Sequence, residues 1–229
     1  MEKKSSSTYY HEPIKGSPMQ NPQIQSGNIQ SSHIDEDILV ILRSALFQDT
    51  PAWHGINTQA FDTCMNLIQN HLSFIPRAHA ETNPAYKQII PYIIFTFDQK
   101  IFVMQRKKTA SEQRLAHKYS LGIGGHVRQE DIVNGDIFTW AQREFQEEVN
   151  YSGSQEMSKV GILNDDTNDV GKVHLGMILL IKGNTDQISI KDEHKSGMLL
   201  SLDECYALAS QMEAWSQICL EFIKQTKLI

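Results

Sequence analysis

Three glutamates could hold a metal ion on one face of a predicted helix. Glu144, Glu147 and Glu148 are spaced i, i+3 and i+4, which places their carboxylates on the same side of an α-helix. Like charges one turn apart destabilise a bare helix by roughly 0.2–0.5 kcal/mol per pair. A divalent cation removes that repulsion, and oxygen ligands suit Mg2+ or Mn2+. The alternative is a solvated acidic face on a surface helix, which charge clusters often form.

The same segment contains the signals that would position this helix. Asp136 is suited to the N-cap, and Asn150 can adopt the left-handed conformation just past the C-terminal end. Upstream, a strand-like stretch over 119–123 leads directly into Gly124 and Gly125. An apolar stripe beside the glutamates can anchor the helix to a core; it consists of Phe138, Ala141, Phe145 and Val149.

Residues 125–151 resemble the Nudix box, the signature of the Nudix hydrolase superfamily: Gly, five residues, Glu, seven residues, then Arg-Glu-U-x-Glu-Glu-x-Gly-U, where U is a bulky aliphatic residue. The matching positions are Gly125, Arg143, Glu144, Phe145, Glu147 and Glu148. The segment departs from the pattern with Asp131 in place of the first Glu and eleven residues between Asp131 and Arg143. Asn150 and Tyr151 replace the closing Gly and aliphatic residue. The stretches KQIIPY and EQRLAHKYSLGIGGH are also similar to a group of bacterial Nudix-like proteins described as phosphoesterases.

The resemblance implies a divalent-metal-dependent hydrolase that cleaves the phosphoanhydride (pyrophosphate) bond of a nucleoside-diphosphate-linked or related small molecule. Glu144, Glu147 and Glu148 would be catalytic and would hold Mg2+ or Mn2+, with the backbone carbonyl of Gly124 as a further ligand. Arg143 would orient Glu144 by hydrogen bonding, although its position also allows an ordinary helical pair with Glu147. The identity of the substrate stays open.

Two other classes of function compete with the hydrolase. One is a Nudix-fold module that binds a nucleotide without cleaving it, because a fold alone does not imply an activity. The variant Glu147→Gln would separate these two hypotheses by abolishing turnover and leaving nucleotide binding intact. The other is an unrelated α/β protein with an acidic helix, which requires the glycine pair, the arginine and the glutamates to coincide by chance.

Residues outside the box supply the remaining candidates. Glu193, on the loop before a capping box at Ser201, is the candidate general base, and a solvated loop acid is its alternative. Arg106, Arg114 and His126 are candidate substrate contacts, since an arginine can bind phosphate oxygens through two parallel hydrogen bonds. For each of these three, a structural or surface role is the alternative.

The chain divides into three predicted regions. Residues 1–30 are rich in Ser, Gln and Pro without hydrophobic periodicity, the composition of a disordered tail. Residues 31–84 form a predicted N-terminal helical extension, with one helix from Ser32 and a second from about Asn57 to Leu72. This extension could pack on the catalytic domain, form a homodimer contact or cover the substrate site. The apolar stripe of the first helix is Ile34, Ile38, Ile41, Leu42 and Ala45.

Residues 85–229 form the predicted catalytic domain. Strand patterns alternate with the acidic helix and with helices over 201–211 and 214–227, which predicts an α/β/α sandwich around a mixed sheet, as the Nudix resemblance also implies. The predicted strands cover 88–97, 101–106, 119–123, 158–163, 173–181 and 188–190.

Composition narrows the class of protein. Of 229 residues, 40% are apolar and 21% are charged, the profile of a soluble globular protein. A net charge of −6 argues against nucleic-acid and membrane-surface binding. No apolar run is long enough to span a membrane. The three cysteines lack metal or redox spacing, so we expect reduced core residues in a cytoplasmic protein.

Overall fold

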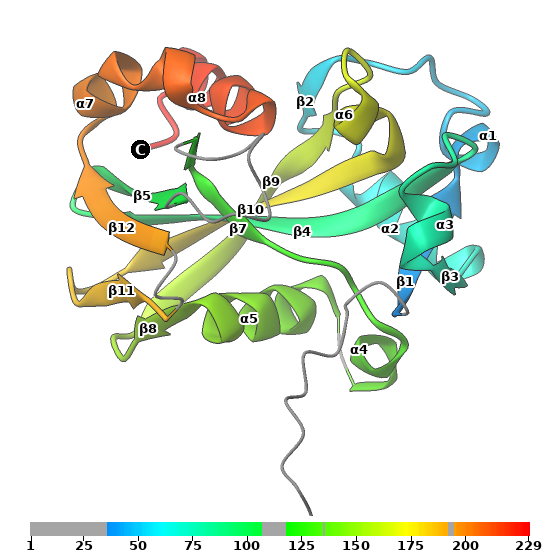
Figure 1. Cartoon of the computed structure of the whole chain (residues 1–229), viewed down its shortest axis with the longest axis horizontal. Coiled ribbons are helices and arrows are strands. Elements are labelled where there is room, and N and C mark those ends of the chain that lie inside the picture. Colours follow the sequence, from blue (N-terminus) through cyan, green and yellow to red (C-terminus); the bar gives the residue numbers. More distant parts are fainter. Residues whose placement is uncertain (1–35, 107–117, 135, 192–194) are drawn as a thin grey trace, which may run out of the picture. The chain divides into compact units, whose positions relative to one another are not determined.

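A computed structural model of the chain describes residues 36–106, 118–134, 136–191 and 195–229. These residues lie in one compact unit, in which helices cover both faces of a large mixed sheet (Figure 1). The predicted α/β/α sandwich is therefore confirmed. The helices are α1 (Arg43–Leu46), α2 (Phe61–Asn70), α3 (Arg77–Ala80), α4 (Gln129–Asn134), α5 (Ile137–Glu148), α6 (Asp169–Val173), α7 (Leu202–Ala207) and α8 (Ala214–Thr226), with a 3-10 turn at Ala209–Gln211.

The main path of the sheet runs β12-β5-β4-β10-β9-β2. Its two central strands, β4 and β10, are parallel and in register from Gln88 opposite His174 to Thr96 opposite Lys182. Both are almost continuously buried, as expected for strands covered on both faces. The strands of this sheet are β1 (Asp37–Leu42), β2 (Gly55–Asn57), β3 (Ser73–Pro76), β4 (Tyr86–Phe97), β5 (Lys100–Arg106), β6 (Tyr119–Ser120), β7 (Gly122–Gly124), β9 (Gln155–Asn164), β10 (His174–Gly183) and β12 (Lys195–Leu200); β8 (Val149–Tyr151) and β11 (Ile188–Ile190) pair separately.

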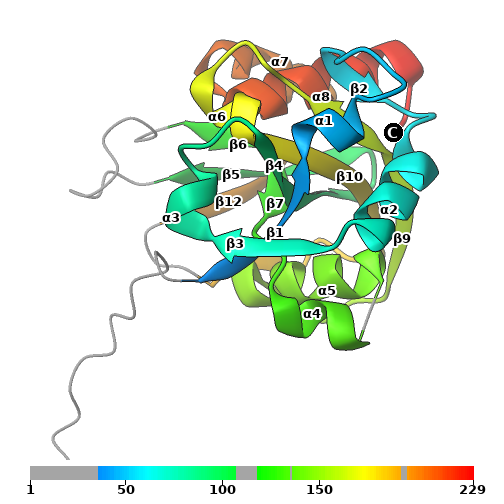
Figure 2. The same ribbon diagram turned by 90° about the vertical axis from the view of Figure 1, so that its right-hand side faces the viewer.

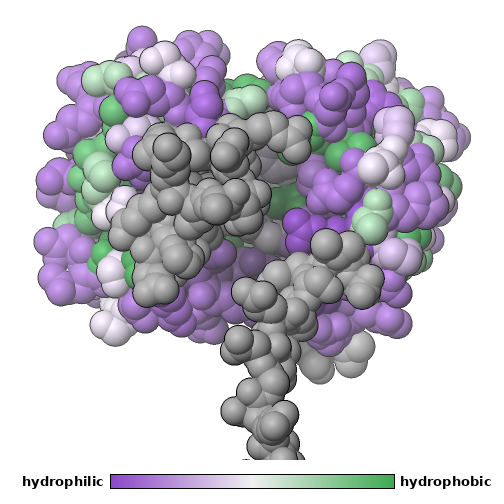
Figure 3. Space-filling view, viewed as in Figure 1, coloured by the Kyte–Doolittle hydropathy of each residue, from purple (hydrophilic) through white to green (hydrophobic). Residues whose placement is uncertain are grey.

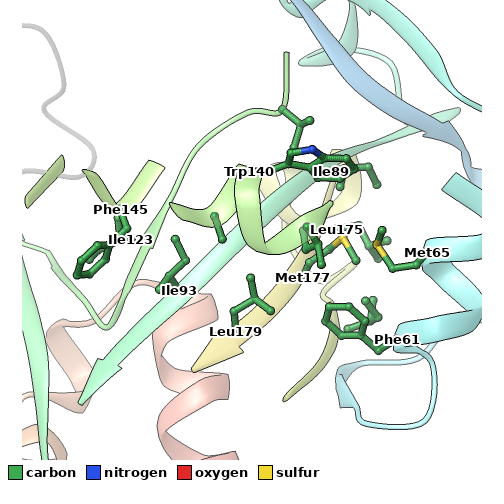
Figure 4. Close-up of a cluster of buried hydrophobic side chains, with 14 of the residues drawn as sticks. Phe61, Met65, Ile89, Ile93, Ile123, Trp140, Phe145, Leu175, Met177 and Leu179 are labelled. Carbon is green, nitrogen blue, oxygen red and sulfur yellow. The ribbon is translucent and has the colours of Figure 1, made fainter. Parts of the chain in front are cut away.

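Side-chain alternation along β4 divides the apolar residues between two cores. Ile93 and Phe95 pack into a cluster with α2 and α5, part of which is drawn in Figure 4. Tyr92 and Ile94 point to the opposite face and pack with α7 and α8. Successive strand residues point to opposite faces, so one strand anchors both helical layers and holds α5 against the sheet.

The predicted helix from Ser32 is wrong over the residues that the structure describes. Residues 37–42 form β1, which pairs with β3 and with β4; the pairing with β3 is visible in Figure 2. Ile38, Leu39, Val40 and Ile41 are all buried. A run of consecutive apolar, mostly β-branched residues fits a strand covered on both faces, and tertiary pairing overrides the helical spacing. β1, which precedes residue 85, also belongs to the same sheet as β4, which follows it.

Most other predicted elements are confirmed. The second N-terminal helix is α2, which buries Phe61, Cys64, Met65 and Ile68. Asp136 caps α5 by accepting hydrogen bonds from the backbone of Phe138 and Thr139. Ser201 and Glu204 form the predicted capping box, although α7 ends at Ala207 and a 3-10 turn follows. The three cysteines are buried free thiols.

The prediction for Asn150 is wrong. Among the described residues other than glycine, a positive φ occurs at Asp98, Gln99 and Lys227. Asn150 instead lies in β8 opposite Ser189. The helix therefore passes directly into a strand, because β11 supplies backbone partners that a free helix end would lack.

The outer surface is largely hydrophilic on the face drawn in Figure 3. Among the described residues, the large apolar side chains that are exposed are Leu42, Leu72 and Val170. No helix in this part of the chain is long and apolar enough to cross a membrane.

A buried ion network ties the first strands to the loop after β9. The ammonium of Lys87, a residue with no exposed surface, donates hydrogen bonds to Asp166 Oδ1 at 2.8 Å and to the carbonyls of Gly171 and His174 at 2.7 and 3.2 Å. Arg43 Nη1 donates to the same Asp166 oxygen at 2.9 Å. These contacts join α1 to β4 and to the segment around α6. β4 and the segment around α6 carry residues that line the pocket described below.

This network makes the free energy of unfolding depend on pH. The hydrogen bond from Arg43, together with Lys87, holds the pKa of Asp166 below its usual range. A carboxylate with a depressed pKa in the folded protein stabilises it above the unfolded pKa, about 3.9, and loses that contribution as the pH falls further. We therefore expect the free energy of unfolding, measured with urea, to fall below about pH 4. The variant Asp166→Asn should show a shallower fall; an identical pH dependence would contradict this assignment.

Candidate active site

A pocket of about 710 Å³ lies where β4, β7, β10 and α8 approach one another. The glycine loop that follows β7 contributes Gly124 and Gly125, and the end of α5 contributes Glu148. His126 and His174 also line it. The pocket therefore brings together residues that are far apart in the sequence, including parts of the predicted metal site.

Arg143 is the hub of the acidic helix. Its guanidinium forms an ion pair with Glu144 Oε1 at 2.8 Å and donates a hydrogen bond to Glu147 Oε2 at 3.0 Å. Arg143 thus contacts both of the glutamates that its two predicted roles involve. The same group also donates to the carbonyl of His126 at 3.1 Å, which ties the helix to the glycine loop.

Asp131 fixes Arg143 from the other side. Its two carboxylate oxygens accept hydrogen bonds from Arg143 Nε and Nη2 at 2.7 and 2.8 Å, the two-point geometry that makes such pairs strong. The backbone N–H of Arg128 donates to Asp131 at 2.8 Å. Part of the lengthened spacer forms α4, and the indole of Trp140 donates to the carbonyl of Asp131. Asp131 therefore keeps an orienting role despite the altered spacing.

Glu144 is buried against the glycine loop. Its exposed fraction is 7%, and burial raises the pKa of its carboxyl to about 7, although Arg143 works in the opposite direction. A Cβ at Gly125 would lie 2.2 Å from Glu144 Oε2, and a Cβ at Gly124 would lie 2.6 Å from the carbonyl of Pro91. A side chain at Gly124 would therefore require the backbone to shift, whereas a side chain at Gly125 would require the Glu144 carboxylate to move.

The variant Gly125→Ala is expected to displace the Glu144 carboxylate. The added methyl group overlaps the end of a side chain that can rotate, so we expect a folded protein with Mn2+ affinity and turnover reduced about 10–100-fold, the effect of disturbing a ligand's surroundings. Metal titration and steady-state kinetics would measure both. Unchanged Mn2+ affinity together with unchanged turnover would exclude Glu144 as a ligand.

The three glutamates differ in their surroundings. Glu144 is buried, Glu147 keeps 47% of its side chain exposed, and Glu148 lines the pocket. Among the described residues, three potential metal ligands have their ligand atoms within 4.8 Å of one another. These residues are Glu81, His126 and His174. The three box glutamates therefore share a helix without converging on one point.

The oxygens near the glycine loop nevertheless suit a hard cation. The Glu144 carboxylate lies directly beside Gly125, and the carboxylate of Glu148 and the backbone of Gly124 border the same pocket. Carboxylate and carbonyl oxygens are the ligands that Mg2+ and Mn2+ prefer. This donor set fits the predicted ion.

His126 is the one candidate substrate contact whose side chain the structure describes. Its Nε2 lies 2.8 Å from Gln88 Oε1, and burial lowers the pKa of the ring to about 3, so the ring is neutral near pH 7. The side chain of Arg106, together with Arg114 and Glu193, lies outside the described residues. Sequence reasoning missed Glu81, and no spacing signal links residues 81, 126 and 174.

Comparisons with known proteins point to one superfamily, although no family model matches the sequence. The chain is 29% identical over 206 residues to the protein YmaB of Bacillus subtilis (strain 168), covering 83% of this chain and 98% of YmaB. It is also 29% identical to Tm1382, whose crystal structure is described as that of a candidate Nudix hydrolase; the match covers 82% of this chain and 98% of Tm1382 with a TM-score of 0.69. A weaker match, a Nudix hydrolase from Nitrosomonas europaea, has 16% identity, coverage of 62% and 90%, and a TM-score of 0.44. The likeness to Tm1382 along nearly its whole length, together with the Arg-Glu-x-x-Glu-Glu helix beside the glycine loop, supports membership of the Nudix superfamily.

Proposed function

We propose that this protein is a divalent-metal-dependent pyrophosphohydrolase that cleaves a phosphoanhydride bond in a nucleoside-diphosphate-linked or related small molecule. The observation that carries the proposal is that Gly124, Gly125 and Glu148 line one pocket, with the Glu144 carboxylate directly beside Gly125. The likeness to Tm1382 supports a hydrolase of the Nudix type.

Glu144, Glu148 and the carbonyl of Gly124 would hold Mg2+ or Mn2+, and Glu147 would contribute after leaving Arg143. When bound, such an ion neutralises phosphate charge and lowers the pKa of a bound water. Arg143 holds the Glu144 carboxylate in place, and Asp131 holds Arg143. Glu193 remains the predicted general base, and Arg106, Arg114 and His126 remain predicted substrate contacts.

The pocket itself suits an anionic small molecule with an aromatic group. Its volume of about 710 Å³ lies in the range typical of small-molecule sites. Arg77 and Lys118 line it and can attract phosphate oxygens. Trp215, which packs edge-on against Tyr92 with ring centroids 5.6 Å apart, also lines it and offers an aromatic surface.

The proposal is tested by incubating the full chain with a panel of diphosphate compounds and measuring released phosphate or nucleoside monophosphate. We expect turnover of at least one compound with Mg2+ or Mn2+ and none after addition of a chelator. Turnover that survives complete metal removal would contradict metal dependence.

The second candidate is a module that binds a nucleotide without cleaving it. Two observations support it: Glu147 forms an ion pair with Arg143, and the carboxylates of the three box glutamates do not form a cluster of ligand atoms. Metal-dependent ligand binding without turnover of any compound in a broad panel would favour this module. With turnover present, Glu147→Gln should reduce it and leave nucleotide binding intact.

A further inference from the structure

A second group of potential metal ligands includes two histidines that line the same pocket. Glu81 directly follows α3, His126 follows the glycine loop, and His174 begins β10. One ligand atom from each lies within 4.8 Å of the other two, and the two imidazole centroids are 5.8 Å apart. Both imidazoles line the pocket. Their two-nitrogen, one-carboxylate composition differs from the oxygen ligands of the acidic helix.

Hydrogen bonds leave one lone pair available on each imidazole. His174 Nδ1 lies 2.7 Å from the carbonyl of Val170, an acceptor that requires the proton on Nδ1 and leaves the lone pair on Nε2. His126 Nε2 lies 2.8 Å from Gln88 Oε1, which likewise leaves the lone pair on Nδ1. Histidine ligands typically donate their second N–H to a carbonyl in this way, which fixes the tautomer and the ring orientation.

The residue that supports His126 is buried. Gln88 has no exposed surface and stands opposite His174 in the parallel register of β4 and β10. Its Nε2 has no hydrogen-bond partner among the described residues, so the amide is held in a buried position without full satisfaction. A buried polar group without a hydrogen-bond partner destabilises the fold. The Gln88 amide contacts His126 and orients its ring.

Glu81 can reach an ion at small cost. Its carboxylate pairs with Arg77 at 3.3 Å in an i,i+4 arrangement in which both side chains are about one-third exposed. Pairs of this kind contribute only a few tenths of a kcal/mol. One carboxylate oxygen can therefore turn to a cation, or the pair can open, with little loss of stability.

We propose that Glu81, His126 and His174 bind Zn2+ as a site separate from the acidic helix. Two imidazoles and one carboxylate form a known ligand set for zinc with an open fourth position, and nitrogen ligands favour Zn2+ over Mg2+. Zinc–nitrogen bonds are about 2.0–2.1 Å, so the ligand atoms must draw closer together by side-chain rotation. His126 and His174 line the pocket that Glu148 also lines, so an ion that they hold can contact a phosphate bound in that pocket.

The test measures zinc alone, without substrate. The full chain is stripped with a chelator, dialysed into excess Mg2+ to occupy the acidic site, and titrated with Zn2+ against a chromophoric competitor. Glu81→Gln is the decisive variant because the side chain is partly exposed, and His126→Asn is the second. His71→Asn, at an exposed histidine after α2, is the matched control, and thermal melting checks that each variant is folded.

We expect one tightly bound Zn2+ per chain. The zinc affinity should be at least about 100-fold weaker in Glu81→Gln and His126→Asn, because loss of a residue that only supports a ligand already lowers metal affinity about 10–100-fold. The zinc affinity should be unchanged in His71→Asn. Substitution with Co2+ should give the absorption of a four- or five-coordinate site. Absence of a tight site, or zinc affinity in Glu81→Gln equal to that of the wild type, would overturn the proposal. Zinc lost in Glu148→Gln but retained in Glu81→Gln would overturn it too, by placing the ion at the acidic helix.

Discussion

Replacing Glu148 by Gln is expected to lower turnover at least about 100-fold. Removing a residue that only hydrogen-bonds to a metal ligand already lowers metal affinity or activity about 10–100-fold, and Glu148 is a proposed ligand itself. Glu148 lines the pocket, whereas Glu144 is buried and Glu147 is paired with Arg143. The carboxylate and the amide have nearly the same shape, so the substitution removes charge and one acceptor without opening a cavity. Steady-state kinetics at saturating Mg2+, and again at saturating Mn2+, would give kcat for comparison with the wild type.

Glu156→Gln is the matched control, since Glu156 is an exposed acid on β9 away from the pocket lining. It should change neither kcat nor the metal concentration for half-maximal rate. A wild-type kcat for Glu148→Gln at all metal concentrations would show that Glu148 does not act in the active site. A rate restored by excess Mn2+ would instead assign the loss to metal affinity.

Asp166→Ala is expected to lower the free energy of unfolding by about 2–3 kcal/mol. Breaking a buried ion pair by removing one partner costs about 3–5 kcal/mol, because it leaves an uncompensated charge. The effect here is smaller because Asp166 keeps 30% of its side chain exposed and Lys87 retains two backbone acceptors. Urea unfolding at pH 7 measures it.

Two variants make this prediction specific. In the double variant Lys87→Met with Asp166→Ala, part of the lost stability should return, because replacing both partners by apolar groups removes the buried charge. Asp169→Ala removes an exposed pair with Lys172 and should cost less than about 1 kcal/mol. Equal losses in Asp166→Ala and Asp169→Ala would contradict the role assigned to the buried network.

Local sequence signals predicted the helices and strands of residues 85–229 well where one mechanism dominated. The capping residues Asp136 and Ser201 act on backbone N–H groups within a few positions of themselves, so their effect can be read without the fold. The periodicity of α2 and α5 and the apolar run of β4 are likewise local patterns.

Residues 37–42 and Asn150 show where local reasoning failed. Ile38 and Ile41 fit a helical spacing, but β3 and β4 provide pairing partners on both sides. Asn150 tolerates a left-handed conformation, but pairing with β11 selects an extended one. In both cases the deciding contact comes from a segment distant in sequence.

Helix spacing and the absence of a Cβ are local properties, so the helix that carries Arg143, Glu144, Glu147 and Glu148 and the glycine loop before it could be predicted from residue order alone. The different surroundings of these charges could not: Glu144 is buried, Glu147 pairs with Arg143, and Glu148 lines the pocket. The tertiary structure also brought Glu81, His126 and His174 together. Burial and long-range pairing depend on which elements pack against each other, and no spacing within one segment encodes that.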